Sequence, residues 1–334
     1  MRIFIYLTLA TLFSWPTTAS AQQKAPDWLF NWINAWELIN KDLLKQPPVE
    51  PPAMLFYDNE YVYTNSVVSA PNGTSIDGPA IYGKNIQWRK ATHADSIMLP
   101  NGQTVPVQLM SFAGPVGNGG TFFVMAAPAF WENAGVKSTL FNLDMMLTGV
   151  FLHEFAHCRQ YEGFGRLIDS IEQKHAFKTV PLNDDIVQGY FKSDSAYVKY
   201  FRTETEMFYS SILPPKKNMG KKFVEMGLGM IESRQRKYFT GDTAILQPLD
   251  NIFLSMEGLG QYVAVSWLCH KQGGNLPLAT AVEGFRRKRN QWSQEEGLSI
   301  FLALGRFAKP GWINKQFGTN PTDVIQLLKE VVGK

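Results

Sequence analysis

Residues 140–158 read LFNLDMMLTGVFLHEFAHC, and this stretch decides the fold around it. Most of its residues are apolar and recur at intervals of three and four, which is typical of a buried α-helix. His153, Glu154 and His157 interrupt the apolar pattern near its end. Because positions four apart lie on one face of a helix, about one turn from each other, the two imidazoles can reach a single ion.

The two histidines and the glutamate form an HExxH pattern, which suggests a zinc site. Imidazole nitrogens bind tetrahedral Zn²⁺, and a set of three protein ligands leaves one position open for water. Glu154 adjoins His153 and can take a proton from that water without binding the metal. The sequence therefore predicts Zn²⁺ as cofactor, with His153 and His157 as ligands and Glu154 as general base. The alternative is that the histidines are hydrogen-bonded core residues or the relic of a zinc site.

Hydropathy and turn signals divide the chain into four parts. Residues 1–21 have a positive start, an apolar run and a small-residue end at Ala19-Ser20-Ala21, which predicts a signal peptide. Residues 22–52 predict an amphipathic helix, whose tryptophan stripe we expect to pack on the body, and a Pro-rich linker. Residues 53–135 predict a β-rich lobe, and residues 136–334 predict a helical lobe with the zinc site. The fold class is α+β, with a small, mostly antiparallel sheet followed by the helical region.

Composition excludes several classes of protein. The chain of 334 residues is 45% hydrophobic and 18% charged, which argues against a disordered segment. Its net charge of +3 makes nucleic acid an improbable partner. The one dense basic run, residues 286–289, reads as a solvated helix face. After residue 21 no stretch reaches the 18 apolar residues of a membrane span, so we expect no integral span. The oligomeric state stays open.

The two cysteines, Cys158 and Cys269, leave one disulfide possible in an exported protein. Both lie in apolar helical patterns, where a free thiol packs as a small hydrophobic group. Two buried thiols are therefore the favoured interpretation.

The HExxH helix and its apolar approach resemble the gluzincin group of zinc metallopeptidases, in which a glutamate on a later helix is the third metal ligand. The likeness covers residues 130–269 best. The pattern HExxHxxGxxH of the metzincins is absent, because Gln160 and Gly163 occupy the positions of its glycine and third histidine. The resemblance implies a zincin-like fold and the hydrolysis of peptide or protein substrates.

Residues 255–262, SMEGLGQY, resemble the EGxxxY helix of bacterial gluzincin-like proteins, whose glutamate faces the metal. This likeness implies Glu257 as the third ligand. Gly258 and Gly260 cost a helix about 1 kcal/mol each relative to alanine, but they allow a close approach to the HExxH helix. Glu204 and Glu206, in a predicted helix at 197–213, are competing candidates for the same position.

A site of this kind also needs an acid that accepts a hydrogen bond from a ligand histidine and a donor that stabilises the oxyanion. A metal-bound histidine usually donates its second N–H to an acid, for which Asp250 or Glu206 is a candidate, although Asp250 also suits a helix N-cap. An oxyanion opposite the metal needs a donor, and Tyr262 is the catalytic candidate.

The prediction from sequence is thus an exported zinc-dependent hydrolase, periplasmic or secreted, that acts as a peptidase through a water activated by Glu154. Two alternatives remain. One is a catalytically inactive binding or scaffold protein of zincin-like fold. The other is a zinc amidase that acts on a non-protein substrate.

Overall fold

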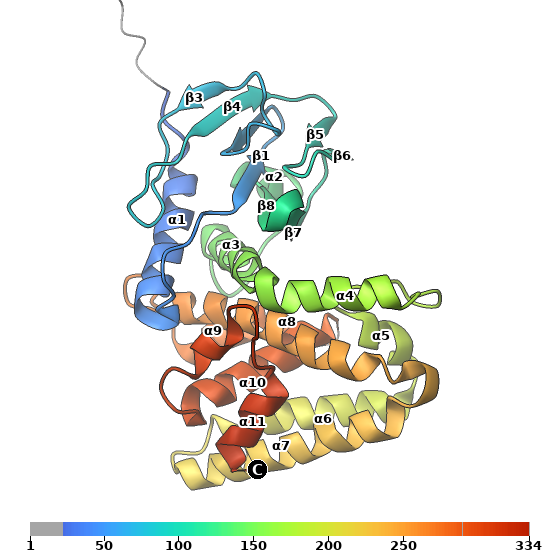
Figure 1. The fold of residues 1–334 in the computed structure, drawn as a ribbon. Coiled ribbons are helices and arrows are strands. Elements are labelled where there is room, and N and C mark those ends of the chain that lie inside the picture. Colours follow the sequence, from blue (N-terminus) through green and yellow to red (C-terminus); the bar gives the residue numbers. More distant parts are fainter. Residues whose placement is uncertain (1–22, 289, 334) are drawn as a thin grey trace, which may run out of the picture.

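The computed structural model describes residues 23–288 and 290–333 and has a mixed α+β fold (Figure 1). A six-stranded sheet lies on one side of helix α3 (Leu143–Gln160), and a body of helices lies on the other side. The predicted α+β class with a small, mostly antiparallel sheet is confirmed. The predicted signal peptide, residues 1–21, lies outside the described residues.

The sheet has the strand order β3-β4-β2-β1-β8-β7. Strands β1 and β8 run parallel, and every other neighbouring pair in the sheet is antiparallel. Strand β7 therefore forms one edge of the sheet, and β8 is its only partner among the described strands. Strands β5 and β6 form a separate antiparallel hairpin. The strands are β1 Ala53–Tyr57, β2 Tyr61–Thr64, β3 Thr74–Ile76, β4 Trp88–Thr92, β5 Ser96–Met98, β6 Thr104–Pro106, β7 Ser111–Val116 and β8 Gly120–Ala126.

The predicted N-terminal helix is α1 (Asp27–Ile39), which continues as a π-helical turn at Asn40–Leu44. Trp32 and Trp36 are buried, and their rings stack on Phe151 and Phe155 of α3 with centroid distances of 5.5 and 4.2 Å. The tryptophan stripe thus packs α1 on the main core, as the sequence predicts.

The helical body is centred on α8, which packs between α3 and α10. The predicted helix at 197–213 is α6. Short 3₁₀ or π-helical segments at Gly117–Gly119, Tyr161–Gly165, Gly241–Thr243 and Trp312–Gln316 connect longer elements. The remaining helices are α2 Pro128–Asn133, α4 Arg166–Lys174, α5 Ile186–Phe191, α6 Ser195–Ser211, α7 Lys217–Tyr238, α8 Leu246–Cys269, α9 Leu278–Phe285, α10 Trp292–Phe307 and α11 Val324–Val332.

A buried arginine ties four of these helices together. Arg234 of α7 binds Glu204 of α6, and it also binds Asp250 of α8 and Glu296 of α10 at 3.1 Å each. All four side chains are buried. One cation among three carboxylates leaves excess negative charge in the core unless a carboxyl is protonated.

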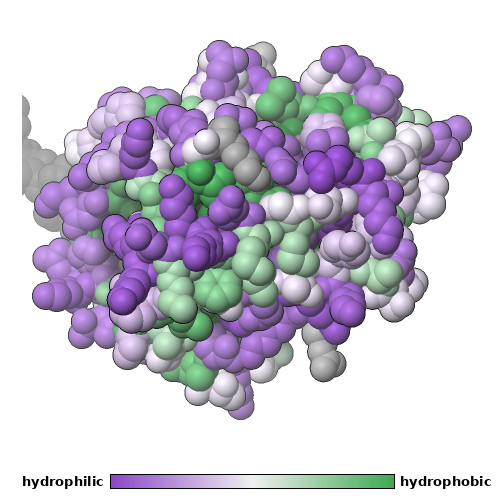
Figure 2. All heavy atoms as spheres, turned by 90° about the horizontal axis from the view of Figure 1, so that it is seen from below, coloured by the Kyte–Doolittle hydropathy of each residue, from purple (hydrophilic) through white to green (hydrophobic). Residues whose placement is uncertain are grey.

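Both cysteines are free thiols, as the favoured interpretation predicts, but only Cys158 is buried, whereas Cys269 is partly exposed. One helical segment, Gly241–Cys269, is long and apolar enough to cross a membrane, but 72% of its most apolar window is buried inside the protein, as in the core helix of a folded domain. The helical face seen from below mixes hydrophilic and apolar side chains (Figure 2).

Candidate metal centre

In helix α3, two phenylalanines and the two histidines lie on opposite faces. Its N-terminus is capped by Asn142, whose side chain accepts a hydrogen bond from the backbone N–H of Met145 at 2.8 Å. Phe151 and Phe155 face α1 and the sheet. His153 and His157 each follow one of these rings by two positions, about 200° around the helix, so they point away from that core.

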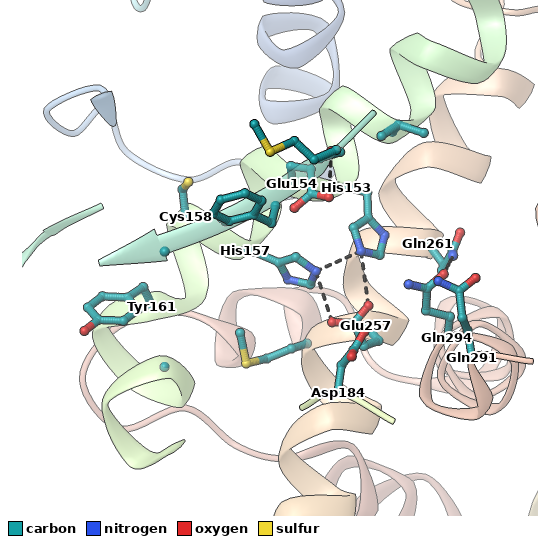
Figure 3. Close-up of a pocket in the computed structure, with 18 of the residues that line it drawn as sticks. His153, Glu154, His157, Cys158, Tyr161, Asp184, Glu257, Gln261, Gln291 and Gln294 are labelled. Carbon is teal, nitrogen blue, oxygen red and sulfur yellow. Dashed lines mark hydrogen bonds and ion pairs between the residues drawn. The ribbon is translucent and has the colours of Figure 1, made fainter. Parts of the chain in front are cut away.

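Three side chains converge where α3 crosses α8 (Figure 3). The Nε2 atoms of His153 and His157 lie 2.8 Å apart. The two carboxylate oxygens of Glu257 each lie 3.2 Å from one of these nitrogens. The candidate ligand atoms all lie within 4.8 Å of one another. The structure thus brings together the three residues that the sequence nominated as metal ligands.

The electrostatics of this group favour a positive charge at its centre. Burial alone would lower the pKa of His157, but Glu257 and other nearby carboxylates raise it to about 9. Burial would raise the pKa of Glu257, whereas the two histidines hold it well below its usual range. Two lone-pair nitrogens that face each other beside a carboxylate require either a proton or a cation between them.

The donor set fits zinc in kind and number. Two imidazoles and one carboxylate are the protein ligands of one common class of catalytic zinc site, and the fourth position stays open. Magnesium and calcium prefer oxygen ligands, so a site with two nitrogen donors suits them poorly. His153, His157 and Glu257 could therefore hold Zn²⁺.

Glu154 lies on the sheet side of the same cavity. Its Oε1 accepts a hydrogen bond from the Ser111 hydroxyl at 2.9 Å. Ser111 is the first residue of edge strand β7, so the carboxylate is tied to the sheet and not to the histidines. Glu154 is 9% exposed and lines the cavity, where it can accept a proton from a bound molecule.

The cavity around these groups measures about 870 Å³. Strand β7 forms one wall through residues 111–115, and α3 and α8 form the floor with the three converging side chains. The segment from α9 to the start of α10 closes the far wall with Arg287, Gln291 and Gln294. This space is large enough for several residues of an extended peptide.

Comparison with known proteins assigns no family. No protein-family model, curated protein or solved structure matches the chain. The functional argument therefore rests on the geometry and chemistry of this cavity.

The two glycines beside Glu257 serve two different helix contacts. A Cβ on Gly260 would lie 2.5 Å from His153 Nδ1, so this glycine makes room for the imidazole. A Cβ on Gly258 would lie 2.8 Å from the carbonyl of Gly297 on α10. Only Gly260 faces the HExxH helix, and Gly258 instead allows the close approach of α10.

The competing glutamates lie elsewhere. Glu204 is fully buried and bound to Arg234. Glu206 is more than half exposed and pairs with Arg286 at 2.6 Å. Neither reaches the three converging side chains, so the structure brings Glu257 alone of these candidates to the histidines.

The structure does not place Asp250 where it could accept a hydrogen bond from the histidine rings, so this expectation needs correction. Asp250 accepts hydrogen bonds from Arg234 and Gln235, and it lies inside α8, which begins at Leu246. It is thus neither a partner of the histidines nor an N-cap. Within the described chain, His157 Nδ1 is buried and has no hydrogen-bond partner, so no acid accepts a hydrogen bond from it.

Tyr262 also needs correction, because the structure does not bring it to the cavity. Its ring packs near Phe301 and Trp312, and it lines a separate pocket with Gly305. Five residues after Glu257 is about 140° around the helix, which turns the side chain away. Tyr262 is therefore not placed to stabilise an oxyanion beside Glu257.

Asp184 is a cavity residue that the sequence did not reveal. It comes from the loop before α5 and points toward Glu257 (Figure 3). Burial and the charge of Glu257 raise its pKa to about 7. In the sequence, only the acidic pair at residues 184 and 185 could have pointed to Asp184 as a cavity residue. Such pairs are usually solvated surface residues.

Arg287 is the second missed residue, and it corrects the interpretation of the basic run. Residues 286–288 form a loop after α9, not a helix face. Arg286 pairs with Glu206 and Glu295, whereas Arg287 lines the cavity.

Proposed function

We propose that this chain is an exported zinc-dependent hydrolase that cleaves peptide bonds, with the zincin-like site of a gluzincin. The observation that carries the proposal is the convergence of His153, His157 and Glu257 on one point, with Glu154 on the same cavity. Export is proposed from the sequence pattern of residues 1–21 alone.

Hydrolysis follows from what each side chain can do. Zinc, when bound, supplies a Lewis acid that lowers the pKa of water and polarises a carbonyl group. Glu154 accepts a proton from the attacking water and delivers it to the leaving amine as the C–N bond breaks. The water oxygen remains on the carbonyl carbon, so the products are a carboxylic acid and an amine. Ser111 holds the Glu154 carboxylate in place through its hydroxyl.

The position of the sheet edge favours a peptide as substrate. Strand β7 pairs only with β8, and its residues line the cavity beside Glu154. An extended peptide can add to such an edge by backbone hydrogen bonds, which do not depend on its side chains. A substrate amide that is not part of an extended peptide backbone would not form these hydrogen bonds with β7.

The decisive experiment compares metal content with hydrolysis. We expect one zinc per purified chain and chelator-sensitive cleavage of unfolded casein. Glu154→Gln should keep the zinc and lose cleavage, by at least about 100-fold, because it removes the base but no ligand. His157→Ala should lose the zinc.

Two results would contradict the proposal. A wild-type protein that takes up no zinc under zinc-replete conditions would exclude the metal site. Full activity of Glu154→Gln would exclude the assigned base. Zinc without cleavage of any peptide would favour a binding protein or an amidase.

A further inference from the structure

A buried carboxylate fixes the loop that carries Arg287. Glu295, 2% exposed, accepts hydrogen bonds from the backbone N–H groups of Arg287 and Lys288 at 2.6 and 3.0 Å. It also accepts one from Arg286 Nε at 2.8 Å. Three donors on one carboxylate hold the backbone of this loop, and hence the base of the Arg287 side chain, in one position.

Arg287 lines the cavity, and its guanidinium has no carboxylate partner among the described residues. Its Nε donates to Gln294 Oε1 at 3.0 Å. Among the described residues, no carboxylate oxygen lies within ion-pair distance of it. Burial lowers its pKa, and the charges of Glu257 and Glu295 partly offset this effect. A guanidinium stays charged at neutral pH, and a partly buried one is stabilised by an anion.

Gln261 and Gln294 form a polar wall beside this arginine (Figure 3). Gln294 Oε1 accepts hydrogen bonds from both Arg287 and Gln261. Gln261 is 1% exposed, and its Oε1 has no hydrogen-bond partner in the described chain. Because a buried acceptor without a partner is costly, a ligand N–H that fills this role would be bound favourably.

We propose that Arg287 binds the free carboxylate at the C-terminus of a peptide, while Gln261 Oε1 accepts a backbone N–H of the same end. The planar fork of a guanidinium matches a carboxylate with two parallel hydrogen bonds. This inference rests on the proposed hydrolase function and narrows it to cleavage near the carboxyl end of the substrate. It makes Arg287 a specificity-determining residue that lies far from the HExxH sequence.

The test uses one peptide in two forms, with a free C-terminal carboxylate and with a C-terminal amide. We expect the zinc-loaded wild type to cleave the free acid with a kcat/KM about 10- to 100-fold higher, the usual range for a hydrogen-bonded charge pair. Arg287→Gln should abolish this preference and keep its zinc. Arg287→Lys should retain part of it, because the charge stays but the fork is lost.

Arg202→Gln is the matched control, since Arg202 is an exposed arginine of α6 outside the cavity. It should keep the wild-type preference. Circular dichroism and zinc content of each variant separate a loss of specificity from a loss of fold. Equal rates on the two peptides in the wild type, or a preference that survives in Arg287→Gln, would overturn the inference.

A binding measurement separates this inference from the proposed hydrolysis. Isothermal titration of both peptides into zinc-loaded Glu154→Gln protein reports recognition without turnover. Tighter binding of the free acid that is lost in Glu154→Gln/Arg287→Gln would support the carboxylate site even if the wild type cleaves neither peptide. Equal affinities would overturn it even if hydrolysis is found.

Discussion

Ser111 shows how one hydroxyl links the sheet to the chemistry of the cavity. Its hydrogen bond to Glu154 crosses 43 positions of sequence and fixes one of the two carboxylate oxygens. The other oxygen stays free to accept a proton. We infer that Ser111 positions the general base and has no contact with the metal ligands.

Replacing Ser111 with alanine should therefore reduce kcat about tenfold, in line with the value of a hydrogen bond to a charged group. Zinc content should stay unchanged, because Ser111 does not contact the candidate ligands. KM should also stay unchanged, because the proposed peptide contacts of β7 are made by its backbone and the Ser111 hydroxyl is bound to Glu154. Steady-state kinetics beside Ser193→Ala, an exposed serine before α6, would check this. A fall in zinc content together with kcat would instead make Ser111 a structural residue.

At the scale of single residues, the sequence predicts the contacts that depend only on the spacing of residues along one helix. His153 and His157 had to share a helix face because four residues complete about one turn. Ser111, Asp184 and Arg287 are separated from them by long stretches of chain, and only tertiary packing brings them to the cavity. No local pattern marks such residues, so sequence reasoning missed all three.

At the scale of secondary-structure elements, the way in which α3 crosses α8 determines whether the three candidate ligands can meet. Gly260 lies at this crossing, against the imidazole of His153. Any side chain there must displace the ring or separate the two helices, since a Cβ at 2.5 Å is well inside contact distance.

We expect Gly260→Ala to weaken zinc binding by at least about tenfold, because it moves one ligand relative to the other two. Gly229→Ala is the matched control, since Gly229 lies inside α7 with no atom near its missing Cβ. That change should leave zinc affinity intact and stabilise the fold by about 0.5–1 kcal/mol. Competition with a chromophoric chelator and chemical denaturation measure the two effects. Unchanged zinc affinity in Gly260→Ala would show that the crossing tolerates a side chain.

Element boundaries were harder to predict than element types. The helical periodicity of residues 140–158 correctly predicts α3. Helix α8 begins at Leu246, with Pro248 in its first turn, a typical start signal. This start excludes the N-cap interpretation of Asp250, one of the two that the sequence left open. The basic run was taken for a helix because charge pattern alone does not show where α9 ends.

For the whole molecule, the buried cluster around Arg234 joins α6, α7, α8 and α10. Two of these helices also carry cavity residues, Glu257 on α8 and Gln294 on α10. The ion pairs thus fix the relative positions of two helices that carry the candidate metal site and the wall beside it. No sequence pattern predicts this network, because its members are spread over nearly 100 residues.

This cluster should make the stability of the fold depend on pH. Burial raises the pKa of Glu204 to about 7, from an ordinary value of 4.5, and burial also raises the pKa of Glu296. A folded state that holds a proton more tightly than the unfolded chain is stabilised at low pH. This stabilisation is complete below about pH 4.5 and is lost as the pH rises through about 7.

Glu204→Gln should flatten this dependence, because the amide can still accept the hydrogen bond from Arg234 but cannot titrate. Between pH 5 and 7, the free energy of unfolding of the wild type should fall more steeply than that of the variant, by up to about 1.4 kcal/mol per pH unit. Chemical denaturation in the presence of a chelator measures this without the pH dependence of metal binding. Glu225→Gln, at an exposed position of α7, should follow the wild type. Parallel curves for wild type and Glu204→Gln would mean that the buried carboxyl stays ionised over this range, with Arg234 alone balancing its charge.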